Sequence, residues 1–109
     1  MAKFTILIFF LSFAAAASAA HADTQVLALE KQCFSCHAFD RQVGKAPAFK
    51  AIAEKYRGRA GVEEDMVQKI KNGGVGHWGN VPMPSPEGRR PAVSEAEARE
   101  LVRWILAMR

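Results

Sequence analysis

Cys33-Phe34-Ser35-Cys36-His37 is the stretch on which the rest of this chain depends. Two thiols separated by two residues, with an imidazole directly after the second, form the attachment signature of c-type haem. On one turn of helix, positions i and i+3 lie on the same face, so both sulfurs can form thioethers to the two vinyl groups of one porphyrin. His37 is then held under the iron, where it can supply the proximal ligand. The pentapeptide predicts one covalently attached haem c.

A Cys-x-x-Cys pair can also be a thioredoxin-like redox pair or half of a zinc site. A zinc site needs two further ligands, but the chain has no other cysteine, and its other histidines are His21 and His77. A redox pair is expected near a βαβ pattern, which the sequence lacks. These features favour haem attachment over both alternatives.

The first 22 residues have the pattern of a secretory signal peptide. The start is basic, residues 4–13 are almost wholly apolar, and a small-x-small cleavage site ends at residue 22. An uncleaved anchor is the alternative, but the apolar run is shorter than the ~20 residues that a spanning helix needs. We expect residues 1–22 to be a cleaved signal peptide, residues 23–109 to form one domain, and the mature protein to reside in the periplasm without stable membrane insertion.

The composition is that of a small and mildly basic domain. The chain has 15 basic and 11 acidic residues and a formal net charge of +4. This balance argues against a nucleic-acid partner, which would call for a clustered basic face, but it permits docking to an acidic patch on another protein. So short a chain buries a modest core and usually needs a staple, which a covalently bound haem would provide.

Hydrophobic periodicity predicts an all-α chain of about four short helices joined by Gly/Pro loops. The first helix is expected to begin at an N-cap at Thr24 and to run towards Cys36. Val26, Leu29 and Cys33 are spaced i, i+3, i+7 and form its expected buried face.

The three later helices have clearer limits. One follows Pro47 and stops at Gly58, the next covers residues 62–72, and the last begins with a capping box of Ser94 and Glu97. We expect the last helix to pack across the first and to bring Trp104 near the haem. The expected buried positions are Phe49, Ile52, Ala53 and Tyr56; Val62, Met66, Val67 and Ile70; and Ala98, Leu101, Val102 and Ile105.

The segment from Gly73 to Pro91 has no helical pattern and is rich in glycine and proline. A loop of this length in a small domain is usually functional or disordered. Its residues 81–86 read Val-Pro-Met-Pro-Ser-Pro, and the alternating prolines fix φ and restrict the unfolded loop. Such a loop can hold one thioether sulfur against a metal, so Met83 is the favoured second ligand to the iron.

Three other side chains could fill that position. Met66 and Met108 fall on helical apolar stripes and have the character of core residues. His77 lies in the same loop as Met83, and imidazole also binds iron well. If His37 and Met83 fill both axial sites, no position is left for oxygen or a substrate. That arrangement predicts an electron-transfer protein and not an enzyme.

Further motifs follow the haem signature in order along the chain. They are Cys33-Phe34-Ser35-Cys36-His37-Ala38, Val43-Gly44, Pro47-Ala48-Phe49, Ile70-Lys71-Asn72-Gly73, Gly76-His77-Trp78-Gly79-Asn80-Val81-Pro82-Met83-Pro84, Val93-Ser94 and Trp104-Ile105-Leu106. In these motifs the chain resembles the small bacterial class I cytochromes c, in particular the cytochrome c-551 (cytochrome c8) type. The resemblance covers nearly all of the expected mature chain.

The resemblance implies an all-α fold whose helices wrap around one haem with an exposed edge. It also implies a role for each matched site residue. Cys33 and Cys36 would carry the thioethers, His37 and Met83 would be the axial ligands, the carbonyl of Pro47 would orient the proximal imidazole, and the indole N–H of Trp78 would reach a haem propionate.

Members of this family shuttle electrons between periplasmic or membrane-bound redox enzymes. The resemblance therefore implies a soluble, monomeric one-electron carrier. Its donors and acceptors would be redox proteins such as a dehydrogenase, a cytochrome bc1-type complex, a terminal oxidase or a nitrite reductase. A haem c subunit held on a periplasmic dehydrogenase is the alternative, and a haem sensor or small peroxidase is a further one.

The sequence departs from the family pattern at two places. Lys45-Ala46 looks like an insertion before Pro47, and residues 87–91 lengthen the loop after Met83. Arg89 and Arg90 in the longer loop either add positive charge near the haem edge or form a solvated turn.

Overall fold

The computed structural model describes residues 19–76, 78–87 and 89–109. These residues form a helical segment over residues 19–30, a 3-10 turn η1 (Cys33–Ser35), and the helices α2 (Phe49–Tyr56), α3 (Val62–Asn72) and α4 (Glu95–Leu106). Within those ranges the β-type pairing is limited to isolated bridges. The all-α prediction is therefore confirmed.

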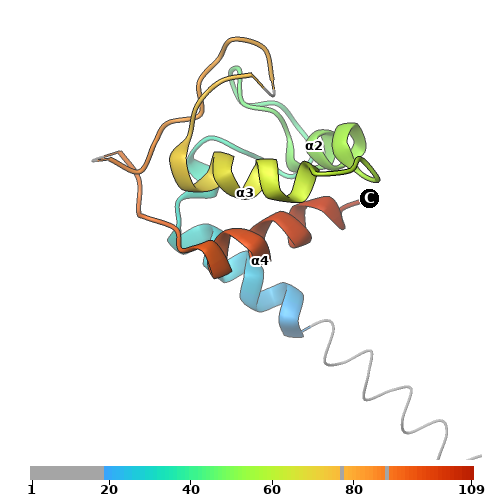
Figure 1. Ribbon diagram of the computed structural model, residues 1–109. Coiled ribbons are helices and arrows are strands. Elements are labelled where there is room, and N and C mark those ends of the chain that lie inside the picture. The colour runs from blue at the N-terminus through green and yellow to red at the C-terminus, as the bar shows by residue number, and fades with distance from the viewer. Residues whose placement is uncertain (1–18, 77, 88) are drawn as a thin grey trace, which may run out of the picture.

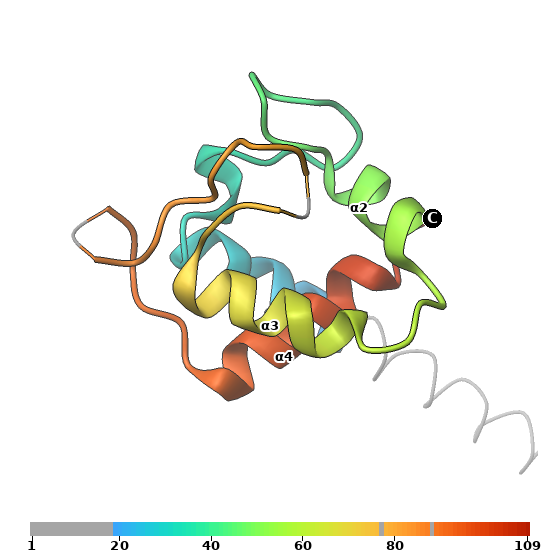
Figure 2. The ribbon, with the colours of Figure 1, turned by 45° about the horizontal axis from the view of Figure 1, so that its top comes forward.

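Helices α3 and α4 lie side by side and run in opposite directions, while the N-terminal helix crosses α4 on its other side (Figures 1 and 2). Two contacts join that crossing: Thr24 Oγ1 lies 2.9 Å from Glu100 Oε1, and Lys31 Nζ lies 3.0 Å from Glu97 Oε2. The expectation that the last helix packs across the first is thus confirmed. Leu101 of α4 is fully buried between these elements.

The start of α4 and the end of α3 lie where the sequence predicts them. In α4, the Ser94 N–H donates to Glu97 Oε2 at 2.8 Å and the Glu97 N–H donates to Ser94 Oγ at 3.1 Å, so the predicted capping box is present. Helix α3 ends at Gly73, which has a φ of +70°. The buried residues of both helices are those predicted from their apolar spacing.

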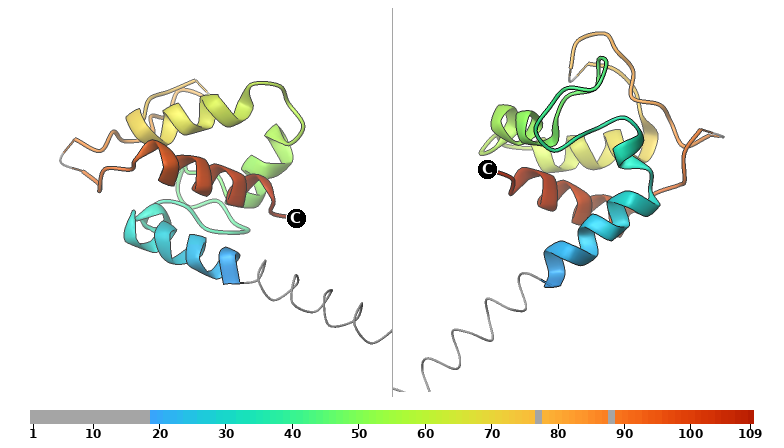
Figure 3. Two further views of the ribbon diagram at one scale, coloured as in Figure 1. Left: turned by 60° about the horizontal axis from the view of Figure 1, so that its bottom comes forward. Right: turned by 180° about the vertical axis from the view of Figure 1, so that it is seen from behind.

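Helix α2 is tied at its start to the segment that follows the cysteines. The first N–H groups of a helix have no partner inside it. Here the Phe49 N–H donates to the Ala38 carbonyl and the Lys50 N–H to the Phe39 carbonyl, each at 2.9 Å. The start of α2 is therefore fixed against the chain beside His37. The left view of Figure 3 shows α4 between α3 and the N-terminal helix.

The N-terminal helix differs from the prediction at its start and its end. It is already helical at residue 19, so Thr24 lies inside it and is not its N-cap; Thr24 Oγ1 is 3.0 Å from the Ala20 carbonyl. The helix also stops before Cys33, because Gln32 has a φ of +61°. This left-handed residue interrupts the helical path, and the cysteines lie on a separate short turn.

The buried face of this helix was also predicted incorrectly. Val26 and Leu29 are 52% and 56% exposed. Thr24 and Ala28, four residues apart, are buried instead. Ala28 lies between Thr24 and Lys31, whose side chains contact α4, so a small residue is buried on the face where larger apolar ones were expected. Among the described residues, no helix is both long and apolar enough to cross a bilayer.

Candidate haem-binding site

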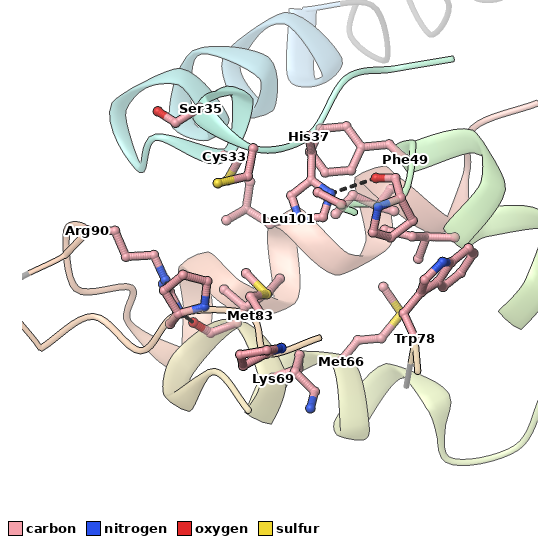
Figure 4. A pocket seen from close by; sticks show the side chains of 18 of the residues that line it. Cys33, Ser35, His37, Phe49, Met66, Lys69, Trp78, Met83, Arg90 and Leu101 are labelled. Atoms are coloured by element: carbon pink, nitrogen blue, oxygen red, sulfur yellow. Dashed lines mark hydrogen bonds between the residues drawn. The ribbon is translucent and has the colours of Figure 1, made fainter. Parts of the chain in front are cut away.

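A cavity of about 520 Å³ lies between the cysteine turn, the three long helices and the loop that follows α3. Its walls are mostly apolar. Both cysteines, His37 and Met83 line it together. Figure 4 shows His37 and Met83 reaching towards this pocket from different segments of the chain. The four side chains that the sequence assigned to haem attachment and ligation are thus brought to one place.

The turn η1 places both thiols on the same cavity. The N–H groups of Cys36 and His37 both donate to the Cys33 carbonyl, at 3.3 Å and 3.0 Å. This closes one tight turn and achieves the predicted i, i+3 placement with 3-10 geometry. Phe34, between the cysteines, packs edge-on against Phe49 and Trp104, with ring centroids 5.7 Å and 6.3 Å away. These aromatic contacts anchor the turn to α2 and α4.

The His37 ring is held by two contacts. Its Nδ1 lies 2.7 Å from the Pro47 carbonyl, and its ring stacks on Phe49 with centroids 5.1 Å apart and planes 20° apart. A carbonyl can only accept, so Nδ1 carries the proton and Nε2 is left for a metal. Burial lowers the pKa of His37, while the bond to Pro47 opposes that shift. The neutral imidazole so favoured is the form that binds metals.

The segment before Pro47 makes a tight turn that accommodates the two extra residues. The Val43 N–H donates to the Ala46 carbonyl at 3.1 Å, and the Ala46 N–H donates back to Val43 at 2.9 Å. Gly44, at a φ of +57°, supplies the left-handed position within that turn. Lys45-Ala46 therefore extends a hairpin-like loop and leaves the contact between Pro47 and His37 in place.

The backbone of Met83 is paired with the residue that follows the C-cap of α3. The Gly74 N–H donates to the Met83 carbonyl at 2.9 Å, and the Met83 N–H donates to the Gly74 carbonyl at 3.0 Å. The side chain is half-buried and packs against the core cluster. Because both the N–H and the carbonyl of Met83 are bonded to Gly74, the loop can hold the thioether in one position.

The rival ligands are placed differently. Met66 lines the same cavity, but from the buried stripe of α3. Met108 lies at a separate, shallower pocket beside Trp104. His77 falls outside the described residues.

Trp78 and Trp104 both line the main cavity. Lys55 Nζ lies 4.5 Å from the centre of the Trp78 ring, a cation–π distance. The Tyr56 ring packs against Trp78 at a centroid distance of 6.4 Å. Trp78 is therefore held at the cavity wall, and the expectation that Trp104 would lie near the haem is consistent with its place there.

The donor set fits haem c. A large apolar cavity is lined by two thiols, an imidazole with one ring nitrogen already engaged, and a thioether. Burial raises the pKa of the Cys33 thiol, while the nearby Arg90 charge opposes that shift. Neither a zinc site nor a dithiol redox pair accounts for the apolar volume, whereas a porphyrin needs it.

Sequence reasoning missed three residues of the site region. Phe49 was assigned to the helix core, but its ring also orients His37. Gly73 is expected only as the first residue of the long loop, whereas the backbone of residues 83–85 packs directly against it. Arg90 was considered as a surface charge, whereas its guanidinium donates to the Pro84 and Ile70 carbonyls. The aromatic periodicity could have pointed to Phe49, but nothing in the sequence signals the contacts of Arg90.

Residues 22–109 match the family model for cytochrome c. The chain belongs to the cytochrome c family and carries a covalently attached haem c, in keeping with electron transfer. Cytochrome c-551 of Pseudomonas aeruginosa is 44% identical over 88 residues, which cover 80% of this chain and 78% of that protein. Cytochrome c-552 of Hydrogenobacter thermophilus is 43% identical over 84 residues, covering 76% and 79%.

A solved structure agrees with these relatives. The crystal structure of Nitrosomonas europaea cytochrome c552 superposes with a TM-score of 0.68 at 36% identity, covering 78% of this chain and 99% of that one. The predicted small class I cytochrome c fold is thus confirmed.

Proposed function

We propose that this protein is a soluble, monomeric one-electron carrier of the periplasm, with His37 and Met83 as the axial ligands of its haem iron. The observation that carries the proposal is that both side chains line one apolar cavity. The His37 ring is bonded to the Pro47 carbonyl, and the backbone of Met83 is fixed by its paired bonds to Gly74. When bound, the haem iron takes up and releases one electron between its ferric and ferrous states.

The chain's own residues make this site suitable for outer-sphere transfer. Phe49 and Pro47 keep the His37 ring in one orientation, and the mostly apolar walls would limit the access of water to a bound haem. A thioether ligand raises the reduction potential of a haem. With both axial positions filled, an electron would pass through the porphyrin edge to a redox partner. Trp78 lines the cavity, and its indole N–H would bond a haem propionate.

The periplasmic assignment rests on the signal-like leader, most of which lies outside the described residues. The family match begins at residue 22, one residue before the expected start of the mature chain. We propose that residues 1–22 are removed on export and that residues 23–109 form the haem domain.

The test starts with holoprotein purified from the periplasmic fraction. The mass of this protein should equal the mass of residues 23–109 plus that of one haem. Its ferric spectrum should show the weak far-red band of iron–thioether ligation, and Met83→Ala should abolish that band. Met66→Leu is the matched control, because Met66 lines the same cavity from α3; the band should survive there. A band that persists in Met83→Ala but disappears in Met66→Leu would assign the ligand to Met66.

Two further observations separate the carrier from its alternatives. Carbon monoxide binding to the untouched ferrous protein at neutral pH would favour a sensor or peroxidase, since it requires an open or displaceable axial site. Stable co-purification with a large dehydrogenase would favour a bound haem subunit.

A further inference from the structure

The C-terminal end of α3 has a carbonyl group that the helix itself does not satisfy. In a continuing helix, the Ile70 carbonyl would accept from the N–H of Gly74. That N–H instead donates to the Met83 carbonyl. The Gly74 N–H therefore joins the end of α3 to the loop that carries Met83, and the Ile70 carbonyl has no donor from its own helix.

The loop lies against this helix end at unusually short range. A methyl group built on Gly73 would meet the Met83 carbonyl oxygen at 2.5 Å, the Ser85 nitrogen at 2.7 Å and the Pro84 carbonyl carbon at 2.8 Å. All three atoms are backbone, so none can swing away. The chain around Met83 thus packs directly on the helix terminus.

Arg90 joins the same two elements through its guanidinium. Its Nε donates to the Pro84 carbonyl at 2.8 Å, and its Nη2 donates to the Ile70 carbonyl, the group that the Gly74 N–H does not reach. A planar guanidinium has donors on separate nitrogens in fixed directions and can bond two carbonyls at once. A positive charge also suits the C-terminus of a helix.

Arg90 is not a free surface charge. The side chain is partly buried and lines the cavity together with Met83. Its neighbour Arg89 also borders the cavity, but its side chain is exposed. Of the two arginines of the lengthened loop, Arg90 bonds backbone carbonyls of the protein, whereas the side chain of Arg89 is exposed to solvent.

We propose that Arg90 is a positioning residue for the sixth ligand: by bonding the Ile70 and Pro84 carbonyls, it keeps the Met83 loop on the end of α3 and so stabilises the bond of the Met83 sulfur to the iron against a competing ligand. This inference rests on the proposed ligation by Met83. In the extended loop, Arg90 supplies the donor that the Ile70 carbonyl lacks within α3, and its second bond, to Pro84, holds the loop that carries Met83.

The test measures how readily imidazole displaces the thioether in ferric holoprotein, followed by loss of the far-red band. Arg90→Met keeps the aliphatic stem and removes both hydrogen bonds. Losing hydrogen bonds from a charged donor should raise the apparent affinity for imidazole on the order of tenfold. Arg89→Met removes the same charge one residue away and should leave that affinity within about twofold of the parent.

Arg90→Lys separates the charge from the shape. One ammonium cannot reproduce the two directed bonds of the guanidinium, so this variant should resemble Arg90→Met. If it matches the parent, the positioning role of the forked contact is overturned.

The melting temperature, followed by far-ultraviolet circular dichroism, gives the readout for a purely structural role. A lower melting temperature in Arg90→Met with an unchanged imidazole affinity would overturn the proposal. If the parent protein has no far-red band, the ligation by Met83 fails first, and the inference about Arg90 fails with it. If the parent has the band and Arg90→Met binds imidazole like Arg89→Met, the inference alone fails.

Discussion

Gly73 shows how a single residue constrains this site. Its φ of +70° is unfavourable for any residue with a side chain, and the space where a Cβ would stand is filled by the backbone of residues 83–85. Two independent requirements, one conformational and one steric, therefore apply at the same position. Both arise because the loop that carries Met83 lies directly on the end of α3.

We expect Gly73→Ala to weaken the protein and the ligation together. The forced φ should cost about 1–2 kcal/mol, and the clash with fixed backbone should add about 1–3 kcal/mol. The check is urea unfolding combined with the far-red band, which should weaken. Gly58→Ala is the matched control, since Gly58 has a φ of +78° but nothing within 4 Å of the position that a Cβ would occupy. Equal losses in both variants would show that the close approach does not matter.

At the level of elements, α3 and α4 have local features at their ends that can be recognised from the amino acids. Helix α4 begins with the reciprocal bonds of Ser94 and Glu97, and α3 has acidic residues in its first turn and lysines in its last. These devices satisfy free backbone groups or complement the helix dipole. They act within a few residues, and this is why the periodic pattern predicted both helices correctly.

Ser94→Ala should lower the free energy of unfolding by about 1 kcal/mol, because the N–H of Glu97 loses its acceptor. Ser94→Thr keeps a hydroxyl and should stay close to the parent. Chemical denaturation of the two holoproteins measures the difference. The far-red band should be unchanged in both variants, since the cap lies outside the ligand set. Equal stability of the alanine and threonine variants would contradict this account of the start of α4.

At the scale of the whole molecule, the haem is part of the core. The described chain surrounds a cavity of about 520 Å³. Its walls are mostly apolar, so without the haem they would be exposed to water, at a cost of about 25 cal/mol per Å² of apolar surface. The helices pack on one another, but the cofactor fills the space between them.

The haem-free chain should therefore lack a stable tertiary fold. We expect the double variant Cys33→Ala/Cys36→Ala, purified without haem, to lose most of its helical signal and its cooperative thermal transition. The single variant Cys36→Ala, with one thioether and His37 intact, should remain folded with haem bound. Circular dichroism on heating distinguishes them. A cooperative transition of the haem-free double variant near that of the holoprotein would contradict the role of haem as core.

The sequence by itself determined the helices and the chemistry of the site. The haem signature, the apolar stripes of α2, α3 and α4, the capping box and the proline-rich segment around Met83 are local patterns, and local patterns follow from side-chain spacing and backbone restriction. The prediction failed where a helix face depended on its neighbour. In the N-terminal helix, Ala28 is buried and Leu29 is exposed, because the face that carries Thr24 and Lys31 is the one turned to α4.

Only the tertiary structure decided how residues distant in the sequence meet. It placed the Pro47 carbonyl on His37 despite the longer turn, brought the Met83 loop onto the end of α3, and turned Arg90 inward to the Ile70 and Pro84 carbonyls. Spacing along the chain carries no information on these contacts. Each depends on backbone groups, which every residue possesses, and only the folded path of the chain selects which of them become partners.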